Sequence, residues 1–158
     1  MSFVWLIKQT TFFVFRIFLI LLLVVNPGSV GAKNSFQNLF EQALQSSQDG
    51  DFIEALARWD QWLEAFPEDA LAWSNRGIVR LALGDFQGAV SDQTKSIELL
   101  PSAPDPHLNR GIAEEALNLL EEAENDYKWI LENNPEDASA LYNLGNIRVL
   151  QGNWVQAE

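Results

Sequence analysis

The stretch "SNRGIVRLAL", Ser74–Leu83, is followed 34 residues later by "LNRGIAEEAL", Leu108–Leu117, so the tetrapeptide Asn-Arg-Gly-Ile occurs twice in a similar setting. A looser copy, "NLGN", lies a further 34 residues along, at Asn143–Asn146. Self-similarity at a fixed period of about 20 to 50 residues is typical of repeat proteins, in which each unit packs mainly on its neighbours. The period therefore predicts a repeat architecture before any single helix or strand is assigned.

A proline recurs with the same spacing of 34 residues, at Pro67, Pro101 and Pro135. Proline cannot continue a helix, so each one is expected to stop the second helix of a repeat. Aligned on these prolines, the repeats span residues 36–69, 70–103, 104–137 and, as an incomplete fourth, 138–158.

Three further columns of the repeat hold small or turn-forming residues. They are Ala43, Gly77, Gly111 and Gly145 at the eighth position, Gly50, Gly84, Asn118 and Gly152 at the fifteenth, and Ala55, Ala89, Ala123 and Ala157 at the twentieth. Small residues let two helices cross closely, and glycine or asparagine ends a helix in the left-handed conformation. Asp51, Asp85 and Asn153 follow the turn and are expected to cap the second helix. The sequence therefore predicts an all-α fold, an α-solenoid of antiparallel helix pairs with three full repeats and an incomplete fourth.

These columns, with the large residues Trp73 and Leu39 at the fourth position, resemble the tetratricopeptide repeat family. The resemblance covers residues 36–158 and implies a superhelical domain, here 33–158, that binds peptides on its concave face. Gln93 departs from the family pattern, which has an aromatic residue at that position. The phrases "LNRGIAEEAL" and "NPEDASALYNLGN" are also similar to repeat proteins of cyanobacteria and plastids, which implies a thylakoid setting.

The asparagine of the recurring phrase lies on a different side of its helix from the glycine. Asn75 is two residues from Gly77, which is about 200° around the helix axis. The resemblance places this side on the concave face, where a carboxamide suits a peptide backbone because it both donates and accepts hydrogen bonds. The predicted peptide-binding residues are Asn75, Asn109, Asn143, Asn146, Ile78 and Ile112. The alternative is that these amides bond the backbone of the adjacent helix.

Catalytic and metal-binding residues are not predicted. The chain has no cysteine and one histidine, His107, and it contains no glycine-rich phosphate loop. His107 is expected to be a packed and satisfied histidine, Trp59 to lie in the core, and Arg76 and Arg110 to reach acids on neighbouring helices. We therefore expect a protein that is not an enzyme and has no cofactor.

The acidic residues all follow position 40, and the chain after residue 32 carries a net charge of −14. Such a surface repels nucleic acids, whose binding depends on lysine and arginine. The expected partner is a protein or peptide that is neutral or basic, without nucleic acid, and with membrane contact only through an uncleaved N-terminal segment.

Residues 1–32 differ from the rest of the chain. Lys8 and Arg16 precede the apolar run "IFLILLLVV", Ile17–Val25, and small residues lead up to Ala32. This order predicts a signal peptide cleaved after Ala32, because the apolar run is shorter than the roughly 20 residues that a membrane span needs. The alternative is an uncleaved anchor over residues 10–25. In both cases the repeat domain is expected across a membrane, in a periplasm, a thylakoid lumen or outside the cell.

The function predicted from these features is a protein–protein interaction module, an exported or lumenal scaffold or assembly factor for membrane complexes. The alternative is a structural or oligomerisation element of the envelope or thylakoid without a dedicated peptide ligand. The final stretch "GNWVQAE" ends inside the predicted second helix of the fourth repeat, which favours a truncated product.

Overall fold

The structure is a computed structural model that describes the backbone of residues 28–152 and the side chains of residues 37–152. This part of the chain contains helices and no strand. The helices are α2 (Gly28–Asp49), α3 (Phe52–Ala65), α4 (Ala70–Ala82), α5 (Phe86–Leu99), α6 (Pro104–Ala116), α7 (Leu120–Asn133) and α8 (Ala138–Leu150). The predicted all-α fold of antiparallel helix pairs is confirmed.

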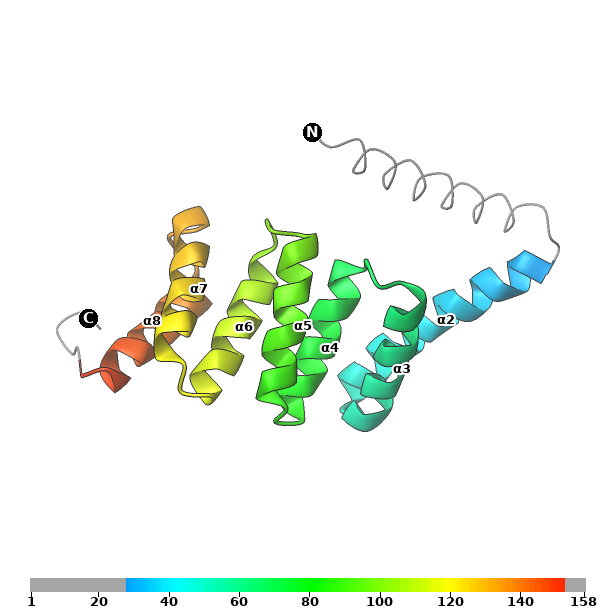
Figure 1. Cartoon of the computed structure of the whole chain (residues 1–158), viewed down its shortest axis with the longest axis horizontal. Coiled ribbons are helices and arrows are strands. Elements are labelled where there is room, and N and C mark those ends of the chain that lie inside the picture. Colours follow the sequence, from blue (N-terminus) through cyan, green and yellow to red (C-terminus); the bar gives the residue numbers. More distant parts are fainter. Residues whose placement is uncertain (1–27, 153–158) are drawn as a thin grey trace, which may run out of the picture. The chain divides into compact units, whose positions relative to one another are not determined.

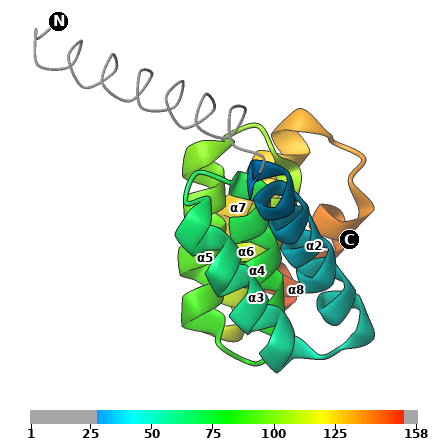
Figure 2. The ribbon, with the colours of Figure 1, turned by 90° about the vertical axis from the view of Figure 1, so that its right-hand side faces the viewer.

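The chain divides after Leu39 into two units, and all packing described below lies within the second unit. In that unit each helix contacts the next one along the chain, from α3 with α4 through to α7 with α8. Figure 1 shows α3 to α8 side by side in chain order, and the view turned by 90° in Figure 2 shows them one behind another. We call α4, α6 and α8 the A helices and α3, α5 and α7 the B helices.

The turn between the paired helices is the one that the sequence predicts. Gly50, Gly84 and Gly152 have φ angles of 82°, 78° and 77°, and Asn118 has a φ of 59°. These values are in the left-handed region, which glycine adopts without strain and asparagine adopts more easily than most residues. Each A helix therefore ends where the turn column places its end.

The predicted caps are confirmed only in part. The carboxylate of Asp85 accepts a hydrogen bond from the backbone of Gly88 at 3.0 Å. Asp51 lies at the start of α3 but makes no side-chain capping bond, so that prediction is wrong. Its backbone angles, φ −79° and ψ 60°, are close to the −82° and 70° of Asp85, so the two residues differ in the orientation of the side chain and not in the backbone. Asn153 lies outside the described residues. Asp69 and Asp137 cap α4 and α8, which the sequence reasoning did not predict.

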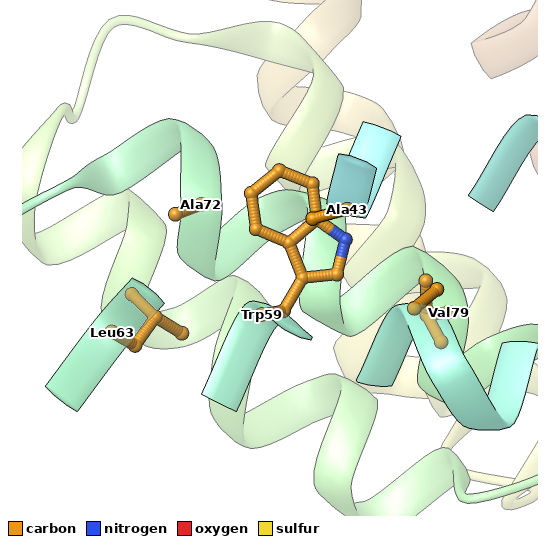
Figure 3. Packing of buried hydrophobic residues seen from close by; sticks show 6 residues of the cluster. Ala43, Trp59, Leu63, Ala72 and Val79 are labelled. Atoms are coloured by element: carbon orange, nitrogen blue, oxygen red, sulfur yellow. The ribbon is translucent and has the colours of Figure 1, made fainter. Parts of the chain in front are cut away.

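The apolar core consists of two clusters separated by a polar stretch. The first surrounds Trp59, which is fully buried as predicted and packs against Ala43, Leu63, Ala72 and Val79 (Figure 3). The second lies in α7 and α8 and consists of Ala123, Tyr127, Ile130, Ala140, Leu144 and Ile147. Between them, α5 buries mostly polar side chains, namely Asp92, Gln93 and Ser96. Polar contacts therefore hold the middle of the array.

Most of the predicted signal peptide, residues 1–32, lies outside the described residues. Helix α2 begins at Gly28 and includes Ala32, the last residue of the predicted signal peptide, while residues 1–27 are not described. Among the described helices, none combines the length and apolarity needed to cross a bilayer. The signal peptide, the alternative anchor and the domain boundary at residue 33 remain predictions.

Candidate functional site

Each A helix exposes a stripe of four residues at the same register. Residues separated by three or four positions lie on one side of a helix, and the stripe follows the spacing i, i+4, i+7 and i+11. We call the twelve residues the amide face; they are Leu71, Asn75, Ile78 and Ala82 in α4, Asp105, Asn109, Ile112 and Ala116 in α6, and Ser139, Asn143, Asn146 and Leu150 in α8. All of them are exposed or half-buried, so the stripe is accessible along three consecutive A helices.

The six predicted peptide-binding residues all belong to the amide face. Ile78 and Ile112 are 43% and 39% exposed, which leaves apolar surface open to a partner. The four asparagines beside them are half-buried. Leu71 and Leu150, at 61% and 62% exposed, extend the apolar surface and are outside the predicted set. The helical spacing of Leu71 and Leu150 from the asparagines is the sequence feature that indicates their place on this face.

The side-chain amides of the face are not used inside the repeat unit. Within residues 37–152, no side-chain hydrogen bond involves Asn75, Asn109, Asn143 or Asn146. By contrast, the buried carboxamide of Gln93 on α5 donates to the backbone oxygen of Ser74 at 3.0 Å. The alternative that the four asparagines bond an adjacent helix is therefore not what the structure shows, and their donors and acceptors are free of side-chain hydrogen bonds within residues 37–152.

Arginines on the same helices point to the other side, toward the B helices. Arg76 bonds both carboxylate oxygens of Asp92 on α5, at 2.8 and 2.7 Å, and reaches Asp60 on α3 at 2.7 Å. The prediction that Arg76 reaches acids on neighbouring helices is confirmed. Such a bidentate contact is a strong and directional ion pair, and here it links one A helix to two B helices.

The same contact recurs in the next repeat. Arg110 bonds both oxygens of Asp126 on α7, at 2.7 and 2.8 Å, and donates to the hydroxyl of Thr94 on α5 at 3.1 Å. His107 lies 2.8 Å from the same carboxylate through Nδ1 and stacks on Trp129 with ring centroids 3.8 Å apart. His107 is packed as predicted, but it is not fully satisfied, because its buried Nε2 has no hydrogen-bond partner.

Burial raises the pKa of Glu114, the next acid on α6, to about 7, and the negative charge of Asp126 adds to the effect. Glu114 is 7% exposed, and its Oε2 atom has no hydrogen-bond partner. Burial would also raise the pKa of Asp126, but hydrogen bonds from Arg110 and His107 outweigh it and hold that pKa below its usual value. These groups form a packed charged cluster between α6 and α7 rather than an open site. No group of three metal-binding side chains lies together in the described part of the chain.

Known proteins share the repeats of this chain. A family profile described as "Tetratricopeptide repeat" matches residues 38–104 and 108–158. The DnaJ homolog subfamily C member 3 of Bos taurus is 33% identical over 88 residues, which cover 56% of this chain and 18% of that protein. The chain therefore spans less than a fifth of the length of this relative.

Solved structures agree with the fold. The first repeat domain of Spaghetti (RPAP3), bound to the HSP90 peptide SRMEEVD, has a TM-score of 0.71 and 28% identity, with 74% of this chain and 93% of that chain covered. MamA from Desulfovibrio magneticus RS-1 has a TM-score of 0.75 and 20% identity, with 80% and 71% covered, and shows the fold alone.

Proposed function

The chain belongs to the tetratricopeptide repeat family, and from this we propose that it is a non-catalytic protein-interaction module that binds peptide segments on the amide face. A general role in protein binding agrees with the similar repeat domain of Spaghetti, which is bound to a peptide. The observation that carries the proposal for this chain is the set of amides on three consecutive A helices that make no hydrogen bond within the described residues. They adjoin exposed apolar side chains, among them Ile78 and Ile112.

Each part of the face has a physical task in this proposal. The amides of Asn75, Asn109 and Asn143 would pair with N–H and C=O groups of a bound backbone, since a carboxamide offers both a donor and an acceptor. The exposed isoleucines would gain about 25 cal/mol for each square ångström of apolar surface that a partner covers. Asn146 stands in α8 at the register of these isoleucines and adds a polar contact there.

The proposal is tested by replacing Asn75, Asn109 and Asn143 together with alanine. Binding of the labelled protein to an array of random octapeptides should fall strongly, while helicity and the melting midpoint stay close to those of the unchanged protein. A matched control replaces three exposed carboxamides on the B helices, Gln61, Gln87 and Asn125, with alanine and should bind as before. If the triple-alanine variant unfolds, the amides are structural, and if it folds and binds as well as the control, the amides do not bind the peptide. The alternative of an oligomerisation element then gains support.

We also propose that the protein works across a membrane, as an exported or lumenal scaffold or assembly factor with a neutral or basic partner. The support is the charge order of residues 1–32 and the net charge of −14 after them. Fusing residues 1–36 to a phosphatase that is active only after export tests whether this segment directs export. Equal phosphatase activity with and without residues 1–36 would contradict the proposal.

A further inference from the structure

The amide face contains no positive charge. Asp105 is the single charged residue among its twelve members. A peptide that carries carboxylates would therefore meet no cation on this face, and would meet one like charge as well. Desolvating a carboxylate without a cationic partner is costly, so such a peptide would lose affinity rather than gain it.

The basic side chains of the two central A helices cannot supply the missing charge. These helices carry three arginines, Arg76 and Arg80 in α4 and Arg110 in α6. Each of them is within 3.2 Å of a buried carboxylate on a B helix, that of Asp92 or Asp126. The side chains of Arg76 and Arg110 are only 12% and 21% exposed, so turning either of them outward would break a bidentate contact with a buried acid.

The amides also select the conformation of the bound segment. A helix satisfies its own backbone N–H and C=O groups, so it offers little to the carboxamides of Asn75 and Asn109. An extended segment leaves these groups unpaired and presents alternate side chains to each side. The open apolar surface of Leu71, Ile78 and Ile112 suits aliphatic side chains of such a segment.

We propose that the amide face selects extended apolar segments from within a polypeptide, with neutral or basic flanks, and rejects acidic C-terminal peptides such as the one bound by Spaghetti. This inference rests on the proposed function, because it names the class of ligand for the same face. It goes beyond the proposed function because it predicts that neither a free C-terminal carboxylate nor acidic side chains of the peptide contribute to binding.

Fluorescence anisotropy with three kinds of peptide tests the inference on the full chain. The first is a pool of acetylated and amidated octapeptides with lysine at both ends and aliphatic residues between. The second has glutamate in place of lysine, and the third is SRMEEVD with its free carboxylate. We expect the first pool to bind about tenfold or more tightly than the other two, and N-methylation of its two central amides to remove most of this binding.

A gain of positive charge on the face should narrow this preference. Ala116→Lys places a cation on the amide face, whereas the matched control Gln87→Lys adds the same charge on the exposed side of α5. Only Ala116→Lys should strengthen binding of SRMEEVD relative to the lysine pool. Equal or tighter binding of the acidic peptides by the unchanged protein would overturn the ligand class while leaving peptide binding intact. Failure of all three probes to bind would count against the proposed function itself.

Discussion

In the α4–α5 pair the carboxylate of Asp92 is held by two guanidinium groups, those of Arg76 and Arg80. In the α6–α7 pair the carboxylate of Asp126 is held in the same bidentate way by Arg110, but its second partner is His107. The two arginine–aspartate contacts have nearly the same distances, 2.8 and 2.7 Å in the first pair and 2.7 and 2.8 Å in the second.

The surroundings of the two contacts differ in charge. One turn beyond the arginine, α4 carries Arg80 and α6 carries Glu114, which occupy the same position in successive repeats. Asp92 therefore lies between two arginines. Asp126 instead shares Arg110 with a second buried acid, Glu114. The same arginine–aspartate bond therefore joins the helices of both pairs, while the charges around it determine how each pair responds to mutation and to pH.

Removing the arginine should show the largest difference between the pairs. Arg110→Met leaves Asp126 buried beside Glu114 with His107 as its remaining partner, and breaking a buried ion pair costs about 3 to 5 kcal/mol. Arg76→Met should cost less, because Arg80 still lies 3.2 Å from Asp92. The free energy of unfolding from urea titrations at pH 8 measures both. Equal losses would show that the neighbours of the two contacts do not matter.

Overfilling the helix crossing should give the next largest effect. A Cβ atom on Gly111 would lie 2.6 Å from Cε1 of the Tyr127 ring, and one on Gly77 would lie 2.6 Å from Nε2 of Gln93. We expect Gly111→Leu to lower the free energy of unfolding by about 1 to 3 kcal/mol, because the ring is rigid and fully buried.

Gly77→Leu is the matched change in the first pair. It should cost less, since the end of the Gln93 side chain can rotate away, although its bond to Ser74 is then lost. Thermal unfolding followed by circular dichroism compares the two variants. A melting midpoint that Gly111→Leu leaves unchanged would contradict the repeat register itself.

The features of the fold that one residue determines were predictable from the sequence. A left-handed turn needs glycine or asparagine whatever surrounds it, so Gly84 and Asn118 fixed the ends of α4 and α6. Contacts repeated at a constant spacing were also predictable: Arg76 and Arg110 each reach an aspartate 16 residues further on. The failed cap at Asp51 shows the limit, since Asp85 has the same residue type and nearly the same backbone angles and does cap its helix, so that side-chain orientation decides the outcome.

The candidate site was predictable to a similar extent. Helical spacing placed Asn75, Asn109 and Asn143 on one side, because a regular helix fixes their angular positions. Spacing could not show whether their amides are used internally, since that depends on how closely neighbouring helices approach. For the same reason the burial of Glu114 and Asp126 within an acidic run was missed: the run "EEALNLLEEAEND" is typical of a solvated surface, and the packing of α6 against α7 buries these two acids.

The protonation of Glu114 should make the stability of the α6–α7 pair depend on pH in a way that the α4–α5 pair, which has Arg80 at this position, does not share. The pKa of Glu114 is about 7 in the folded chain, compared with an ordinary value of 4.5. As the pH rises from about 4.5 to about 7, the unfolded chain therefore loses this proton before the folded chain does, and the free energy of unfolding falls. Glu114→Gln removes this dependence and should stabilise the protein at pH 8 by about 1 to 2 kcal/mol relative to the unchanged chain. The difference between the two pKa values corresponds to about 3 kcal/mol, and solvent screening and the lost attraction between Glu114 and Arg110 reduce this figure.

Urea titrations between pH 5 and pH 8 measure the free energy of unfolding and its slope against pH. The control Glu132→Gln removes an exposed acid from α7 and should leave the slope unchanged. A slope that is the same in both variants would show that Glu114 is charged and solvated in the folded chain. The two helix pairs would then not differ in their response to pH.

The smallest expected effect concerns the turn of the second pair, where Asn118 stands in place of the glycine of the first. Its φ of 59° is in the left-handed region, as is the 78° of Gly84. Asn118→Gly should therefore raise the free energy of unfolding by a few tenths of a kcal/mol at most, because relief of strain is offset by the greater freedom of glycine in the unfolded chain. Asn118→Ala should lower it by about 1 kcal/mol, because alanine has neither the freedom of glycine nor a polar side chain to support this conformation. The order glycine, asparagine, alanine in urea midpoints would show that the turn is limited by backbone conformation alone. If alanine matched asparagine, the backbone at this turn would have to relax out of the left-handed region, and the turns of the two pairs would no longer be equivalent.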